Sequence, residues 1–241
     1  MNQVQFRFYG KLNDLLPEDR RGKAVLVAFN NGQTVKHLIE SLGVPHTEVQ
    51  GLRANGAAID FTYQVRHGDQ IEIYPAVWND SDRPVEGEWR FVLDNHLGRL
   101  AVYLRMLGFD ALYRNDYQDE ELARLCDQEG RILLTRDKRL LMRNAVKRGY
   151  WIRSKVPRHQ LEEVVQHFGL TAAVRPFQRC LRCNSALIAV SKEEVLDRLQ
   201  PLTKLYYDEF HLCPACNQIY WKGSHYERMQ QMIQQVLRPQ G

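Results

Sequence analysis

Long apolar runs, an N-terminal signal and low-complexity tracts are all missing from this 241-residue sequence. No stretch approaches the roughly 18–20 apolar residues that a membrane-spanning helix needs. The opening residues, MNQVQFRFYG, lack the basic start and the apolar segment of a secretory signal peptide. With 44% hydrophobic and 26% charged residues, the composition is that of an ordinary globular protein. We therefore expect a globular cytoplasmic protein without a membrane segment.

A surplus of one charge sign is also missing from the chain as a whole, whose formal net charge is +4. The first 80 residues hold 8 Lys and Arg against 9 Asp and Glu, whereas residues 136–158 hold nine basic residues and one acid, Asp137. This middle region is where a polyanion would dock. A solvated basic face is the alternative interpretation.

Cysteine is scarce, with five residues in all, and four of them form Cys180-x-x-Cys183 and Cys213-x-x-Cys216. Because cytosolic thiols stay reduced, disulfides are not expected. Two such loops can present four thiolates tetrahedrally, which predicts a structural zinc site without an open position for catalysis. Redox and iron–sulfur roles are the alternatives. The remaining Cys126 lies in a helical pattern and is expected in the core.

Residues 1–78 follow the order strand, strand, helix, strands, which is typical of a β-grasp domain. Val4, Phe6 and Phe8 alternate with polar residues, and Thr34 is placed to cap a helix. The motifs FRFYGKLNDLLP, VKHLIESLGVP and VRHGDQIEIYPAV resemble the ubiquitin-like sulfur carriers of molybdopterin and thiamine synthesis. Those carriers end in a free Gly-Gly, whereas this segment continues into WNDSDRPVEGE. This favours a binding or packing module over a sulfur carrier.

A polar stretch with Pro and Gly, residues 79–88, is interpreted as a linker. After it, strand patterns at 89–94, 109–114, 131–135 and 150–153 alternate with helix patterns at 95–107, 119–129, 138–148 and 157–168. Such alternation favours a parallel sheet with helices on both faces, and hence a three-layer α/β/α domain over 89–175. The cysteine module and a helix at 226–237 complete the chain over 176–241.

Carboxylates follow three strands of this α/β domain. Asp94 ends the first strand, Asp119 opens the helix after the second, with Asp116 and Glu120 nearby, and Asp137 follows the third. Because parallel strands end at one edge of a sheet, these groups should gather there. Oxygen-only ligands suit Mg²⁺ or Mn²⁺, which can activate water against a phosphodiester. The alternative is that Asp94 and Asp137 only cap helices, a contribution of about 1 kcal/mol.

Two residues of helix 95–107 lie on the side of Asp94. Gly98 serves either close packing or space beside the carboxylate, and Arg105 meets either an acid or a phosphate. In helix 138–148, basic residues recur every four positions, and two more stand on either side of Asp137. Such a stripe would follow a phosphate backbone. The residues predicted to bind it, which the resemblance described next makes RNA, are Arg136, Lys138, Arg139, Arg143 and Lys147.

Four motifs, in order, resemble the RNase family named after the C-terminal domain of the Mut-seven exonuclease: FVLDNHLGRLAVYLRMLGFD, ILLTRDKRLL, RCLRCNSAL and HLCPACNQIYWKGSHYERM. The resemblance implies a PIN-like nuclease fold with a zinc ribbon, preceded by a ubiquitin-like domain. It also implies a metal-dependent acidic site and RNA as the substrate.

The resemblance also assigns roles. Asp94 matches the first-strand acid, Thr135 and Asp137 match the TRD motif, and Arg105 matches the LR pair. Asp119 fits best as the second acid, with Asp116 and Glu120 within reach. The YWKGSHY stretch, residues 220–226, belongs to the match, and a structural role is favoured for His225 because four cysteines already complete the zinc shell.

The sequence therefore predicts a ribonuclease with Mg²⁺ or Mn²⁺ at Asp94, Asp119 and Asp137, whose cleavage polarity stays open. A non-catalytic RNA- or ribosome-binding adaptor with a vestigial acidic site is the alternative. The β-grasp domain is a candidate surface for a protein partner. Base-stacking candidates, of which at least half are expected in the core, are Tyr150, Trp151, Tyr220 and Trp221.

Overall fold

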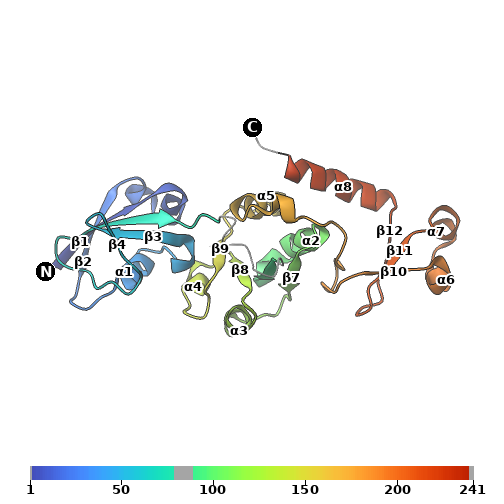
Figure 1. Cartoon of the computed structure of the whole chain (residues 1–241), viewed down its shortest axis with the longest axis horizontal. Coiled ribbons are helices and arrows are strands. Elements are labelled where there is room, and N and C mark those ends of the chain that lie inside the picture. Colours follow the sequence, from blue (N-terminus) through green and yellow to red (C-terminus); the bar gives the residue numbers. More distant parts are fainter. Residues whose placement is uncertain (1, 79–88, 239–241) are drawn as a thin grey trace. The chain divides into compact units, whose positions relative to one another are not determined.

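The computed structural model describes residues 2–78 and 89–238 (Figure 1). The chain forms two compact units, each made of two segments: Met1–Trp78 with Tyr117–Ile152, and Asn79–Asp116 with Arg153–Gly241. The linker predicted at 79–88 lies outside the described residues. Among the residues that are described, no helix combines the length and the apolar character needed to cross a bilayer.

A mixed five-stranded sheet with one helix forms the N-terminal segment of the first unit. Its strand order is β2-β1-β5-β3-β4, with β1 parallel to β5 and the other pairs antiparallel. Three short 3₁₀ turns lie at Gly10–Leu15, Glu18–Arg20 and His46–Glu48. The elements are β1 (Asn2–Phe8), β2 (Ala24–Phe29), α1 (Val35–Ser41), β3 (Val49–Ala54), β4 (Ala57–Ala58) and β5 (Gln70–Pro75). This confirms the predicted β-grasp order.

The alternation read from the sequence determines this sheet's buried face. Val4, Phe6 and Phe8 are all buried, and the helix adds Val35 and Ile39 to the same core. As predicted, the Thr34 side chain caps the start of α1. It accepts a hydrogen bond from the backbone N–H of His37 at 3.3 Å. Local caps and strand periodicity thus suffice to specify this segment.

The second segment of this unit carries α3 (Asp119–Glu129), β8 (Ile132–Thr135), α4 (Lys138–Leu141) and β9 (Gly149–Trp151), with β8 parallel to β9. The helix predicted over 138–148 is wrong beyond Leu141. After that residue, tertiary contacts hold the backbone: the Val146 carbonyl bonds His46 Nε2 at 3.0 Å, and Asn144 accepts from Lys36 at 2.6 Å. These contacts override a moderate helix propensity.

The second unit begins with β6 (Arg90–Leu93), the 3₁₀ turn Asn95–Leu97, α2 (Gly98–Met106) and β7 (Asp110–Tyr113), and continues with α5 (Pro157–His167) and a 3₁₀ turn at Leu170–Ala173. Strand β6 is parallel to β7, and α2 packs on α5 and β7. A Cβ on Gly98 would lie 2.7 Å from the Tyr113 ring. Close packing is therefore what this glycine provides.

The C-terminal part of this unit is a small antiparallel sheet in the order β10-β11-β12, followed by a helix. Its core is small and comprises Val195, Leu199, Phe210 and Ile219. The elements are β10 (Ile188–Val190), α6 (Lys192–Val195), a 3₁₀ turn at Leu196–Arg198, α7 (Pro201–Tyr206), β11 (Phe210–Leu212), β12 (Ile219–Trp221) and α8 (Ser224–Leu237). The predicted fold class, α/β with parallel strands between a β-grasp domain and a cysteine module, is confirmed.

Candidate metal centre and acidic residues

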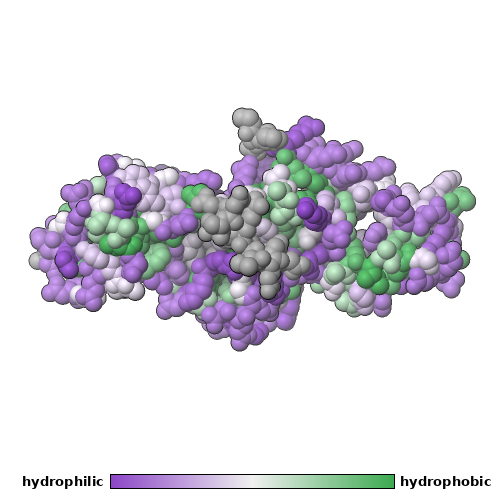
Figure 2. Space-filling model, in the orientation of Figure 1, coloured by the Kyte–Doolittle hydropathy of each residue, from purple (hydrophilic) through white to green (hydrophobic). Residues whose placement is uncertain are grey.

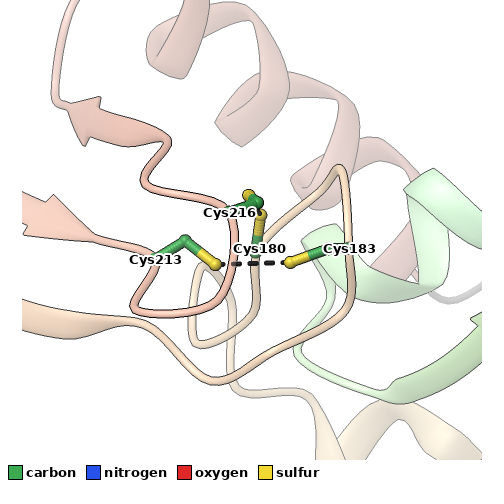
Figure 3. A group of neighbouring side chains, drawn as sticks. All are labelled: Cys180, Cys183, Cys213 and Cys216. Carbon is green, nitrogen blue, oxygen red and sulfur yellow. Dashed lines mark hydrogen bonds between the residues drawn. The ribbon is translucent and has the colours of Figure 1, made fainter.

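Four cysteine side chains point toward one another at the turn between β11 and β12 and the loop before β10 (Figure 3). Their sulfur atoms all lie within 4.8 Å of one another. The Sγ atoms of Cys180 and Cys216 are 3.5 Å apart, and those of Cys183 and Cys213 are 3.3 Å apart. Tetrahedral thiolates at a Zn–S distance of about 2.3 Å would be separated by roughly 3.8 Å. The four cysteines are thus positioned to hold a metal ion, and the all-sulfur set is compatible with zinc.

Both cysteine loops have the same backbone fold. In each, the first cysteine, Cys180 or Cys213, donates its N–H to the carbonyl five residues on, and its own carbonyl accepts from the residue four positions on, over 2.8–2.9 Å. That residue is Asn184 in one loop and Asn217 in the other, with φ of +74° and +58°. Asparagine tolerates this left-handed conformation better than most residues. Because both pairs end in Cys-Asn, Asn217 could have been singled out from the sequence.

The thiols differ in how readily they ionise. Burial, with hydrogen bonds to the neighbouring thiols, raises the pKa of Cys216 to about 12. Burial also opposes ionisation of Cys183, but hydrogen bonds from Ser185 and from neighbouring thiols outweigh it and lower its pKa to about 6. Four thiolates this close repel one another unless a cation balances their charge. The donor set therefore fits a divalent soft-metal ion.

A tyrosine and an arginine support the first cysteine loop from outside. The Tyr220 Oη lies 3.2 Å from Cys180 Sγ and accepts from the Leu181 N–H at 3.1 Å. Burial, and next the bond to Cys180, raise the pKa of this phenol. Arg105 is buried and donates from Nη1 to the carbonyls of Leu181 and Arg182, both at 3.1 Å. Such outer contacts orient metal ligands and tune them.

The same loop is tied to β7. Arg105 Nε donates to the Ala111 carbonyl at 2.9 Å, and the Asn184 amide accepts from the Ala111 N–H at 2.9 Å. Asn184 also donates to Asp110 at 2.8 Å. The predicted candidate Arg105 thus bonds backbone carbonyls of β7 and of the cysteine loop. This joining role could not be derived from the sequence, because the partners lie more than 70 residues away along the chain.

Asp137 follows β8 and is exposed at the start of α4. Its N–H donates to the hydroxyl of the fully buried Thr135 at 2.9 Å, and its Oδ1 accepts from the Arg139 N–H at 2.8 Å. The capping interpretation therefore holds for Asp137. Thr135 fixes the backbone from which this carboxylate projects.

Asp94 follows β6 and is 9% exposed. Its Oδ1 accepts from the Asn95 N–H at 2.6 Å, at the start of the 3₁₀ turn that precedes α2. A carboxylate in this position again caps a turn at the end of a parallel strand. Capping uses only part of the acceptor capacity of a carboxylate, which has about four lone-pair sites.

The three candidates for the second acid are each near an arginine. Asp116 forms a bidentate pair with Arg114, at 2.9 and 2.8 Å, which lowers the pKa of Asp116. Arg143 Nη2 lies 3.5 Å from Asp119 and 3.0 Å from Glu120. A backbone hydrogen bond, and then Arg143, lower the pKa of Glu120. All three carboxylates are exposed.

The predicted basic stripe is wrong as a single helical face, because α4 ends at Leu141. Arg143 pairs with acids as described, and Lys147 donates to the Asn144 carbonyl at 2.7 Å. Lys138 donates to the Leu15 carbonyl at 2.7 Å and lies 4.6 Å from the centre of the Trp151 ring. Arg139 is exposed, whereas Arg136 is half-buried.

The aromatic candidates divide as the sequence suggested. Tyr150 is buried in the core, and Trp151 is half-buried with its indole N–H donating to the Arg136 carbonyl at 3.1 Å. Trp221 is 38% exposed. His225 is exposed near the start of α8. Cys126 is buried, as expected, and burial raises the pKa of its thiol to about 12.

Comparison with known proteins finds two families that match this chain. Residues 89–233 match the family described as the Mut7-C RNAse domain, and residues 1–80 match the family described as Mut7-C ubiquitin. No curated protein is similar enough to the chain to count as a match.

Solved structures with some similarity include small archaeal modifier protein 1 from H. volcanii, at 15% identity and a TM-score of 0.27. Another, from Pyrococcus furiosus, is described as molybdopterin converting factor, subunit 1, at 16% identity and a TM-score of 0.26. Each is covered over 100% of its own length and 32% of this chain. The first family match spans more than half of the sequence, and the chain belongs to the Mut7-C RNase domain family.

Proposed function

We propose that this protein is a metal-dependent ribonuclease that hydrolyses RNA phosphodiester bonds. The observation that carries the proposal is that acids follow the ends of parallel strands within a domain that matches an RNase family. Asp94 follows β6, and Asp137 follows β8. Asp119 opens α3 and serves as the second acid.

The proposed site uses carboxylate oxygens only, a donor set that suits Mg²⁺ or Mn²⁺. An ion bound there would supply a water of lowered pKa and would balance charge on the scissile phosphate. Thr135 holds the Asp137 backbone through its buried hydroxyl, which limits the motion of that carboxylate. Arg139, which is exposed two residues after Asp137, is a candidate for contact with an RNA phosphate.

The four cysteines are proposed to hold structural zinc, since a thiolate set with no open position serves folding rather than hydrolysis. Arg105, which bonds the carbonyls between Cys180 and Cys183, supports this loop. The basic residues of 136–158 are proposed to contact RNA. For the ubiquitin-like domain we propose a role in protein interaction.

Cleavage of end-labelled single-stranded RNA tests the proposal. Zinc-loaded protein is assayed with Mg²⁺, with Mn²⁺ and without either, beside Asp94→Asn and Asp137→Asn. Cleavage should require the added ion and fall at least about 100-fold in both variants, as expected when a main transition-state contact is lost. Asp127→Asn, an exposed acid on α3, is the matched control and should keep full activity. Turnover that persists in both site variants would contradict the proposal.

One observation favours the adaptor function. Arg143 lies within 3.5 Å of both Asp119 and Glu120, and so neutralises charge that a catalytic cation would need. If the protein is an adaptor, its affinity for RNA depends steeply on the salt concentration. The RNA then stays uncleaved with either ion and with either aspartate variant. Arg143→Ala separates the two functions. It should raise cleavage if the pair restrains an active site, and it should only weaken binding if the protein is an adaptor.

A further inference from the structure

A hollow in the second unit is lined by none of the proposed acids. It has a volume of about 190 Å³ and is enclosed by residues 176–181, by β11 and β12 and by α8. Its walls carry the side chains of Phe177, Trp221 and Tyr226, together with Arg179, His211 and Lys222. A second hollow beside it shares Trp221 and Tyr226 with the first. Aromatic and cationic residues, with the acid Glu209 among them, therefore line the same space.

Phe177 adopts an unusual backbone conformation to line this hollow. Its φ of +61° lies in the left-handed region, which is unfavourable for a bulky residue. The backbone is held there by the Phe177 N–H, which donates to the Met106 carbonyl at 3.1 Å. This conformation brings the Phe177 ring to 4.4 Å from the Tyr226 ring, with an angle of 38° between the planes. The left-handed conformation of Phe177 therefore places its ring beside Tyr226 at the wall of the hollow.

The rings do not belong to the core of the cysteine module. That core comprises Val195, Leu199, Phe210 and Ile219, with Val190, Tyr207 and Leu212 packed against it. Trp221, at the end of β12, is 38% exposed. A partly exposed indole that lines two hollows has a face available for stacking.

Positive charge lies beside these rings. The Lys222 side chain is 56% exposed and pairs with Glu209, and the Arg179 side chain lies 3.8 Å from Asp110. His211, half-buried on β11, adds a hydrogen-bonding group. A nucleotide offers a flat base that can stack on the rings and a phosphate that can pair with the cations. It therefore matches both kinds of group in this hollow.

A different surface of this unit is formed by α7, whose residues Leu202, Leu205 and Tyr206 are 69%, 69% and 68% exposed. Apolar surface is visible over the end that carries α6, α7 and the small sheet (Figure 2). Tyr206 is not among the residues that line the hollow, so this exposed ring supplies a control residue.

We propose that the hollow lined by Phe177, Trp221 and Tyr226 is a base-binding subsite for single-stranded RNA. Bases stack on Trp221 and Tyr226, and Lys222 reaches the backbone phosphate. The choice of RNA rests on the proposed function, whereas the stacking chemistry rests on the rings themselves. The subsite would add affinity for the strand through residues that take no part in the proposed hydrolysis.

Binding of fluorescein-labelled single-stranded RNA tests the subsite. Anisotropy is measured on zinc-loaded Asp137→Asn protein without Mg²⁺ or Mn²⁺, so that the strand stays intact. Trp221→Ala and Tyr226→Ala should each weaken binding about 10-fold, since base–aromatic stacking contributes roughly 1–3 kcal/mol per base. Trp221→Phe keeps a ring and should retain most of the affinity. Tyr206→Ala should change it less than twofold.

An abasic oligonucleotide of equal length and charge separates stacking from charge. The aromatic variants should bind it like the parent, whereas Lys222→Ala should weaken both probes. Equal weakening of both probes by Trp221→Ala, no effect of either aromatic variant, or failure of the parent to bind RNA would overturn the subsite. Zinc content and circular dichroism identify any variant that is merely misfolded. Because no cleavage is measured, failure here leaves the proposed hydrolysis to its own test.

Discussion

Tyr220 lies outside the four ligands, and its hydroxyl reaches a cysteine sulfur, at 3.2 Å from Cys180. Its ring comes from β12 and its Oη also accepts from the loop backbone at Leu181. The phenol therefore stabilises both the sulfur and the turn that carries it. Through these two hydrogen bonds, one side chain affects how firmly the loop holds a metal.

Tyr220→Phe should lower the affinity for Zn²⁺ by about 10–100-fold, because it removes this outer contact and keeps the ring. Competition with a chromophoric chelator measures the affinity directly. Tyr206→Phe, which changes an exposed phenol on α7, is the control and should leave the affinity unchanged. If both variants bind zinc equally well, the hydroxyl does not stabilise the site.

The spacing of the cysteines predicted which side chains gather, whereas the role of the acids stays a prediction; in neither case did the spacing show how each group is held. Two C-x-x-C pairs are sufficient to indicate a metal site, since ligand number and spacing are local properties. The three carbonyl partners of Arg105 are not local, because two of them lie 76 and 77 positions away. Arg143 is similar, since its pairing with Glu120 joins residues 23 positions apart. Such contacts exist only once the chain has folded.

Among the helices, α3 was predicted to the residue and α4 was not. Three acids in the first turn of α3 complement the helix dipole, and Gly130 ends it in the left-handed conformation with φ of +61°. The segment after Leu141 has no comparable stop signal in its sequence. Its Val146 carbonyl is bonded by His46 and its Asn144 side chain by Lys36, both from the β-grasp domain, which a pattern within the segment cannot reveal.

Helix α2 ends in a motif that depends on Gly108. The Gly108 N–H bonds the Arg105 carbonyl and the Phe109 N–H bonds the Leu104 carbonyl, both at 3.0 Å, with φ of +95° at the glycine. This pair of bonds is a Schellman motif. A Cβ here would lie 2.0 Å from the Arg175 carbonyl oxygen, so the end of α2 is also packed against another segment.

Gly108→Ala should destabilise the protein by about 3 kcal/mol or more, since it combines backbone strain with a clash against backbone. Gly22→Ala is the matched control: its φ is +69°, and a Cβ there meets nothing within 4 Å. Strain alone should cost that variant about 1–2 kcal/mol. Urea unfolding measures both, and equal losses would show that the approach to Arg175 contributes nothing.

Within the first unit, the β-grasp domain packs with residues 117–152 of the same chain. Trp151 of β9 packs against the β-grasp core, and its backbone N–H donates to Glu48 Oε1 at 2.7 Å. Glu48 itself is only 4% exposed. The Lys138 side chain, next to Asp137, reaches the Leu15 carbonyl. These contacts give the ubiquitin-like domain a packing role beside its proposed protein interaction, because they bind it to the segment that carries two of the proposed acids, Asp119 and Asp137.

Glu48→Ala tests whether these contacts hold the unit together. The substitution leaves the Trp151 N–H without its acceptor, which should cost about 1–3 kcal/mol of unfolding free energy. Glu48→Gln keeps an oxygen acceptor and should cost less, and Glu18→Ala, an exposed residue, should be neutral. Urea unfolding is followed by tryptophan fluorescence and by circular dichroism. If Glu48→Ala unfolds like Glu18→Ala, the β-grasp domain is not fastened to β9 by this bond, and a separately acting module becomes the better interpretation.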